Sequence, residues 1–133
     1  MALKKGYKAM VDEAMAEVKT LSVAEAQALH GNPKYLFVDI RDPRELERDG
    51  KVTGAISAPR GMLEFWVDPD SPYYRKDFST DREWVLYCGA GWRSALATQT
   101  LQEMGFTNVS HIDGGFGAWK AANAPIEALK PKT

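Results

Sequence analysis

Two short apolar segments, residues 35–38 and 84–87, constrain the fold of this chain more than any other feature. Each is a near-continuous apolar run of strand length, whereas a strand with one face in solvent alternates apolar and polar residues. Strands that are buried on both faces are typical of parallel sheets covered by helices on both sides. We therefore expect a parallel sheet with helices packed against each of its faces.

Helix signals separate the strand segments, so strands and helices alternate along the chain. Ser22 with Glu25, and Asp42 with Glu45, have the spacing of capping boxes at helix starts. Further strands are expected at residues 55–58 and 109–112, each followed by turn or helix signals. This alternation predicts the α/β class, with a parallel sheet of about five strands flanked by helices on both faces.

The length of 133 residues suits one compact domain with its own core. We assign residues 20–127 to this domain, residues 1–19 to an N-terminal helical extension and residues 128–133 to a C-terminal tail, of which we expect residues 130–133 to be frayed. Residues 7–18 hold apolar side chains at helical spacing and predict a short amphipathic helix that packs on the domain. A helix that binds a membrane surface or a partner is the alternative.

Charge and cysteine content limit the partners and the compartment. With 17 Lys and Arg against 18 Asp and Glu, a net charge of -1 creates no field that would attract nucleic acid or an anionic membrane. The single cysteine excludes an internal disulfide and suits a reducing compartment. Neither an export signal nor an apolar run of about 20 residues, enough to span a bilayer, is evident. We expect a soluble cytoplasmic protein.

The only cysteine, Cys88, follows the strand at 84–87 directly, and sites in parallel sheets lie beyond the carboxyl ends of the strands. A cysteine attacks as a thiolate, so its surroundings must favour the anion. Gly89 and Gly91 allow successive amides to point inward, a helix start adds its positive end, and Arg93 adds a cation. The alternative is a cysteine that serves only as a small buried hydrophobe.

These residues resemble the rhodanese family of sulfurtransferases, and the similarity covers roughly residues 20–127. Five segments carry it in the expected order: Val38-Asp39-Ile40-Arg41, Gly54-Ala55-Ile56-Ser57-Ala58-Pro59, the segment from Tyr87 through Cys88 and Arg93 to Ala95, Met104-Gly105-Phe106, and Gly114-Gly115-Phe116-Gly117-Ala118-Trp119.

The resemblance implies a thiosulfate sulfurtransferase (rhodanese) activity. Cys88 would take a sulfane sulfur from a donor such as thiosulfate, hold it as a persulfide and pass it to cyanide or a thiol. The resemblance further implies that the substrate sulfur lies against the loop residues Gly89, Ala90, Gly91, Trp92 and Arg93. No metal or organic cofactor is needed for this chemistry. Because a second cysteine is absent, the acceptor must be external, either a small molecule or a protein thiol.

Three further residues are expected to support the site. Ser94 follows the loop, and the resemblance suggests that Asp39 braces the loop or neighbouring cations, although a simple turn residue is equally consistent with its position. Arg60 follows the strand at 55–58 and could supplement Arg93, the alternative being a solvated surface arginine. His30 and His111 lack neighbours at metal-ligand spacing, so both are interpreted as structural and no metal site is expected.

Two other functions remain open. A phosphatase or arsenate reductase of similar architecture would place five residues between its cysteine and arginine, whereas four separate Cys88 from Arg93. The second alternative is a non-catalytic rhodanese-like module that only binds a partner. The Gly89 position, often basic in the rhodanese family, leaves Arg93 as the only loop cation and leaves the preferred donor undecided.

Overall fold

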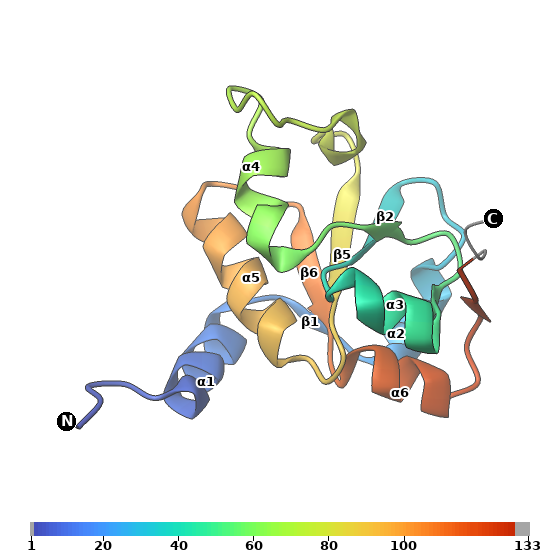
Figure 1. Ribbon diagram of the computed structural model, residues 1–133, viewed down its shortest axis with the longest axis horizontal. Coiled ribbons are helices and arrows are strands. Elements are labelled where there is room, and N and C mark those ends of the chain that lie inside the picture. Colours follow the sequence, from blue (N-terminus) through green and yellow to red (C-terminus); the bar gives the residue numbers. More distant parts are fainter. Residues whose placement is uncertain (1, 130–133) are drawn as a thin grey trace.

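The computed structural model describes residues 2–129 and contains a five-stranded parallel sheet (Figure 1). Its strand order is β1-β6-β5-β2-β4. The strands are β1 (Thr20–Leu21), β2 (Tyr35–Asp39), β4 (Ile56–Ser57), β5 (Glu83–Tyr87) and β6 (Val109–Ile112). In the register, Asp39 lies opposite Tyr87 and Leu86 opposite His111. Strand β5 therefore lies in the middle of the sheet, with its carboxyl end between those of β2 and β6.

Successive residues of the central strands point to opposite faces and feed two separate cores. On one face, Leu36 and Val38 of β2 pack with Trp84 and Leu86 of β5. This core also includes residues of α4 (Leu63–Val67) and α5 (Trp92–Glu103). On the other face, the intervening side chains pack against α2 (Val23–Leu29) and α6 (Gly115–Ala121). The predicted α/β sheet with helices on both faces is confirmed.

Both predicted capping boxes form. The backbone N–H of Glu25 donates to Ser22 Oγ at 3.1 Å at the start of α2, and the Glu25 carboxylate accepts from the Ser22 N–H at 3.0 Å. Asp42 and Glu45 make the same exchange at the start of α3 (Pro43–Asp49), where Pro43 occupies the first turn. These reciprocal bonds satisfy amides that would otherwise lack partners in the first turn.

Several short elements were not expected from the sequence. Strand β1 has two residues, and a second sheet pairs β3 (Lys51–Val52) with β7 (Ile126–Glu127) in antiparallel fashion. Two-residue strands are too short to show a periodic pattern, which is why the sequence did not indicate them. The segment after β4 forms η1 (Arg60–Met62), α4 and η2 (Lys76–Phe78).

The N-terminal segment forms α1 (Tyr7–Glu17), which packs against α5. Ala14 is fully buried on this helix, and the ring of Tyr7 lies 5.4 Å, centroid to centroid, from that of Trp92. Gln99 of α5 donates to the Glu17 carboxylate at 3.0 Å. Of the expected C-terminal tail, residues 128–133, the last four residues lie outside the described part of the chain. Among residues 2–129, no helix has the length and apolar character to cross a bilayer.

We expect the substitution Ala14→Arg to lower the free energy of unfolding by about 1–3 kcal/mol, because a long charged side chain would overpack the contact of α1 with the domain. Urea denaturation measures this change. Ala16→Arg, on the exposed side of the same helix, is the control and should change stability by less than about 0.5 kcal/mol. Equal effects of the two substitutions would show that α1 does not rest on the domain.

Candidate active site

The loop that holds Cys88 connects β5 to α5 at the centre of the carboxyl edge of the sheet. Gly91 is the residue before α5 and has a φ of 99°, a left-handed conformation that disfavours side chains. A Cβ there would also lie 3.2 Å from the amide nitrogen of Gly114. A glycine at this position therefore lets the chain reverse directly from the strand into the helix.

The sulfur of Cys88 is buried, yet hydrogen-bond donors surround it. Its Sγ accepts from the amide of Gly91 at 3.2 Å and from the amide of Ser94 at 3.3 Å, and the Ser94 hydroxyl oxygen lies 3.6 Å away. Cys88 itself is only 1% exposed. A buried anion requires such donors, because it has lost its hydration. The arrangement suits a thiolate better than a hydrocarbon surround would.

The first turn of α5 also holds unused donors. The amides of Trp92 and Arg93 donate to no acceptor within residues 2–129, as is usual for the first amides of a helix. Together with the positive end of the helix dipole, they form a place where a further negative atom bonded to Cys88 could be held.

A second glycine-containing loop, at the start of α6, is hydrogen-bonded to the loop that holds Cys88. The amide of Phe116 donates to the Cys88 carbonyl at 2.7 Å, and the amide of Gly117 donates to the Gly89 carbonyl at 3.0 Å. Gly115 approaches so closely that a Cβ on it would lie 2.3 Å from the Cys88 carbonyl oxygen. Gly114 and Gly115 were identified from the sequence as part of a segment that resembles the family. The contact of Gly115 and Phe116 with the cysteine loop could not be predicted from the sequence.

Arg93 lies beside the loop but is paired with Glu45 of α3. Its Nη1 and Nη2 donate to the two carboxylate oxygens at 2.8 and 3.0 Å. This pairing lowers the pKa of Glu45 and raises that of Arg93. The guanidinium remains close to the loop, because a Cβ on Gly89 would lie 3.2 Å from Nη2. Glu45 was expected only as a capping-box partner, and it performs both tasks.

Asp39 forms a buried ion pair with Arg41. It accepts from the Arg41 amide and Nε, each at 3.0 Å, and from Nη2 at 2.7 Å. Nη2 also donates to the Gly50 carbonyl at 2.7 Å, and the guanidinium lies 4.2 Å from the centre of the Phe116 ring. Asp39 thus braces a neighbouring cation, and that cation packs on the residue whose amide holds the Cys88 carbonyl.

The remaining expected site residues differ in their placement. Ala90 is exposed on the loop, and Trp92 is 57% exposed and packs against Tyr7. Arg60 is exposed, and within the described chain its side chain forms no hydrogen bond or ion pair. The structure therefore brings Ser94 and the loop together around the sulfur, and it gives Arg60 no link to them.

His111, on β6, lies one hydrogen bond behind the site. Its Nδ1 is 2.9 Å from Ser94 Oγ and its Nε2 is 3.1 Å from Thr20 Oγ1. Burial lowers the pKa of His111 to about 4, so the ring is neutral at neutral pH. The sequence could not indicate this contact, because it depends on the parallel pairing of β6 with β5. His30, in contrast, contacts the Thr53 carbonyl at 2.7 Å and packs on Phe37 and Trp119.

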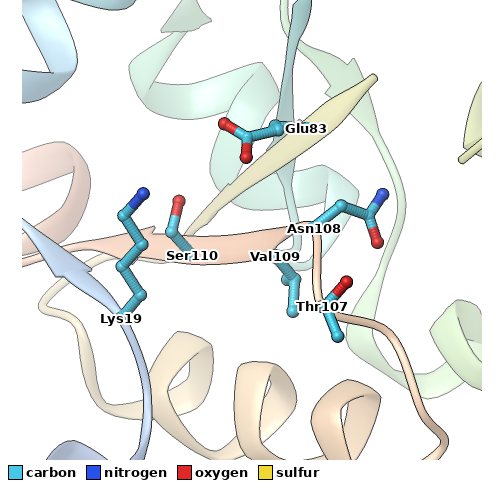
Figure 2. A pocket seen from close by; sticks show the side chains of 6 residues that line it. All are labelled: Lys19, Glu83, Thr107, Asn108, Val109 and Ser110. Carbon is cyan, nitrogen blue, oxygen red and sulfur yellow. The ribbon is translucent and has the colours of Figure 1, made fainter. Parts of the chain in front are cut away.

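Hollows at the two ends of the sheet differ in their relation to Cys88. A cavity of about 20 Å³ lies where β5 and β6 begin, bordered by Lys19, Glu83 and Asn108 (Figure 2). This is the opposite end of the strands from Cys88. A hollow of about 270 Å³ between α1 and Trp92 lies instead beside the cysteine loop. No group of His, Cys, Asp and Glu within residues 2–129 is arranged to hold a metal ion.

A family model, a curated relative and a solved structure all assign the chain to the same family. The sequence matches the rhodanese-like domain family over residues 22–122. It is 32% identical over 108 residues to the thiosulfate sulfurtransferase GlpE of Vibrio cholerae, which covers 81% of this chain and 93% of that protein. The polysulfide-sulfur transferase of Wolinella succinogenes superposes with a TM-score of 0.73 at 31% identity, over 93% of this chain and 88% of that chain.

A further solved structure resembles the chain over nearly its whole length. It is a Rhodopseudomonas palustris protein of unknown function, described as a possible tyrosine phosphatase. It superposes with a TM-score of 0.92 at 54% identity, over 96% of this chain and 98% of that chain.

Substitution of Asp39 should be costly. We expect Asp39→Asn to lower the free energy of unfolding by about 3–5 kcal/mol, because Arg41 would remain buried without its counter-ion. Asp42→Asn removes a carboxylate from an exposed pair three residues away and preserves a good helix cap, so it should cost less than about 0.5 kcal/mol. Chemical denaturation of both variants tests this. Similar losses in the two would contradict the importance of the buried pair.

The Glu45–Arg93 pair should make stability depend on pH in the acid range. Because pairing holds the pKa of Glu45 below its ordinary value of 4.5, its contribution is complete above that value and is lost as the pH falls through the lowered pKa. We expect Glu45→Gln, which retains the capping box, to cost about 1 kcal/mol at neutral pH and nothing at strongly acid pH. Thermal melting across pH measures it, with the exposed Glu47→Gln as control. A difference that persists at low pH would refute the pairing as its cause.

Proposed function

Because the chain belongs to the rhodanese-like domain family, we propose that it is a sulfurtransferase that carries a sulfane sulfur as a persulfide on Cys88. The observation that carries the proposal is the presence of two pairs of backbone amide donors at the start of α5. The amides of Gly91 and Ser94 donate to Sγ, and those of Trp92 and Arg93 have no other acceptor within the described chain. An anionic sulfur attached to Sγ would find these two amides at the head of the helix.

The cycle consists of two displacements. The Cys88 thiolate attacks the outer sulfur of a donor such as thiosulfate, an S–S bond forms on Sγ, and the donor S–S bond breaks with its electron pair leaving on sulfite. A nucleophilic acceptor, cyanide or a thiolate, then attacks the outer sulfur of the persulfide. The bond pair returns to Sγ and restores the thiolate. Each displacement exchanges one sulfur bond for another, so the cycle requires no external oxidant or reductant.

The charges around the loop bear on the choice of donor. Arg93 is the cation of the loop, and Glu45 neutralises it through both Nη atoms. The donor anion would then be held mainly by amides, with less help from a free guanidinium than a dianion such as thiosulfate would gain from one. A donor of lower charge, for example a persulfide or polysulfide, suits this site at least as well as thiosulfate.

Phosphatase activity is the second candidate, because the similar Rhodopseudomonas palustris protein is described as a possible tyrosine phosphatase. A phosphatase of this kind would use the arginine to bind two oxygens of the phosphoryl group. Here both Nη atoms of Arg93 are bound to Glu45, and the loop has only four residues between Cys88 and Arg93. These features favour an attached sulfur atom over a phosphoryl group.

Intact-mass spectrometry separates these functions. After treatment with thiosulfate, or with a low-molecular-weight persulfide, we expect the protein to gain the mass of one sulfur atom and to lose it again on addition of cyanide. Cys88→Ser should gain nothing. An unchanged mass with every donor would leave a binding module as the function, and hydrolysis of an aryl phosphate that depends on Cys88, without sulfur uptake, would establish the phosphatase.

A further inference from the structure

A buried chain of polar side chains leads away from the sulfur into the sheet. Cys88 Sγ lies 3.6 Å from Ser94 Oγ, Ser94 Oγ lies 2.9 Å from His111 Nδ1, and His111 Nε2 lies 3.1 Å from Thr20 Oγ1. Cys88, Ser94 and His111 are each 1% exposed or less. Solvent therefore cannot supply hydrogen bonds to these atoms in place of the contacts within the chain.

The number of available hydrogens allows two hydrogen-bond arrangements for this row of side chains. Ser94 has one hydroxyl hydrogen, and a neutral imidazole has one N–H. If Ser94 donates to Sγ, its oxygen must accept from an N–H on Nδ1 of His111, and Nε2 then accepts from Thr20. If Ser94 donates to Nδ1 instead, the sulfur must be a thiol that donates to Ser94, and Nε2 carries the proton.

The far end of this row of side chains is compatible with the first state. Thr20 Oγ1 has two acceptors for its hydrogen, His111 Nε2 at 3.1 Å and the Met15 thioether at 3.9 Å. A thioether is a weak acceptor, so little is lost when the hydroxyl donates to the ring nitrogen instead. Two amides aimed at Sγ favour a sulfur that accepts over one that donates. An ionised sulfur has no hydrogen to donate, so it selects the first state, with the N–H on Nδ1.

We propose that His111 is a positioning residue that holds its proton on Nδ1, donates to Ser94 and thereby turns the Ser94 hydroxyl hydrogen toward the Cys88 sulfur. The inference rests on the proposed function and assigns this relay, His111 with Ser94, to one half of the cycle. When an acceptor attacks the outer sulfur of the persulfide, the electron pair of the S–S bond moves to Sγ. The Ser94 hydroxyl meets that developing charge, so the relay assists delivery of the sulfur.

The position of the proton can be measured directly. Long-range ¹H–¹⁵N correlation spectra of labelled, reduced protein distinguish a protonated Nδ1 from a protonated Nε2. The spectra are recorded at a pH where the alkylation rate of Cys88 has reached its plateau, so that the sulfur is ionised. We expect Nδ1 to carry the proton. A proton on Nε2 under these conditions would overturn the relay.

Variants test whether the proton position matters. An asparagine amide nitrogen can occupy the place of Nδ1, whereas a glutamine amide reaches toward the place of Nε2. Single-turnover transfer from the Cys88 persulfide to a small thiol should therefore be about tenfold slower in Ser94→Ala and in His111→Gln. His111→Asn should retain the rate within about threefold. Equal slowing by Asn and Gln would reject the role of the Nδ1 proton.

A double variant separates a relay from a structural effect. Because His111 acts through Ser94, His111→Gln should slow the reaction no further once Ser94→Ala is present, whereas independent damage to the fold would multiply the two losses. Unfolding transitions of every variant verify the native fold. Should the wild-type protein form no persulfide, the proposed function fails, while the ¹H–¹⁵N spectrum and the alkylation rates of the same variants with iodoacetamide still decide the relay.

Discussion

The Cys88 sulfur is buried at the junction of a strand and a helix, and much of the surrounding structure follows from that position. If this sulfur is to become negative, the chain needs hydrogen-bond donors placed around it. The amides of Gly91 and Ser94 meet this need only if the chain turns into α5 immediately after β5. The left-handed conformation of Gly91 permits that turn, and the close approach of Gly115 lets the start of α6 hold the Cys88 carbonyl from behind. Two helix starts thus fix one short loop, and the parallel sheet brings both to the same edge.

Two arginines near this loop, Arg41 and Arg93, are each paired with a carboxylate. Asp39 neutralises the buried Arg41, and Glu45 neutralises Arg93. What remains directed at the sulfur is a pair of backbone amide dipoles, which need no counter-ion and do not reorganise when charge develops. Such a site discriminates by the size and position of the anionic atom more than by its total charge. This fits a single sulfur that shuttles between partners of different charge.

Sequence patterns predicted the sheet, the helix starts and the position of Cys88, because each depends on residues close together in the chain. The apolar run at 84–87 and the glycines that follow it are local signals of a strand and a turn. The partners of the site could not be found in this way. Glu45 had a sufficient local explanation as a helix cap, and His111 meets Ser94 only through the pairing of β6 with β5. The two-residue strands could not be predicted because they are too short to show a periodic pattern.

The N-terminal helix lies outside the family match, which covers residues 22–122, yet it contacts residues of the candidate site. At one end of α1, Tyr7 packs on Trp92 of the cysteine loop, and near its other end Met15 Sδ lies 3.9 Å from Thr20 Oγ1. Thr20 in turn holds the ring nitrogen of His111 that faces away from the sulfur. The helix thus contacts the threonine at the far end of the proposed relay. Helix α1 therefore contacts the cysteine loop at Trp92 and the first strand of the sheet at Thr20, on two sides of the candidate site.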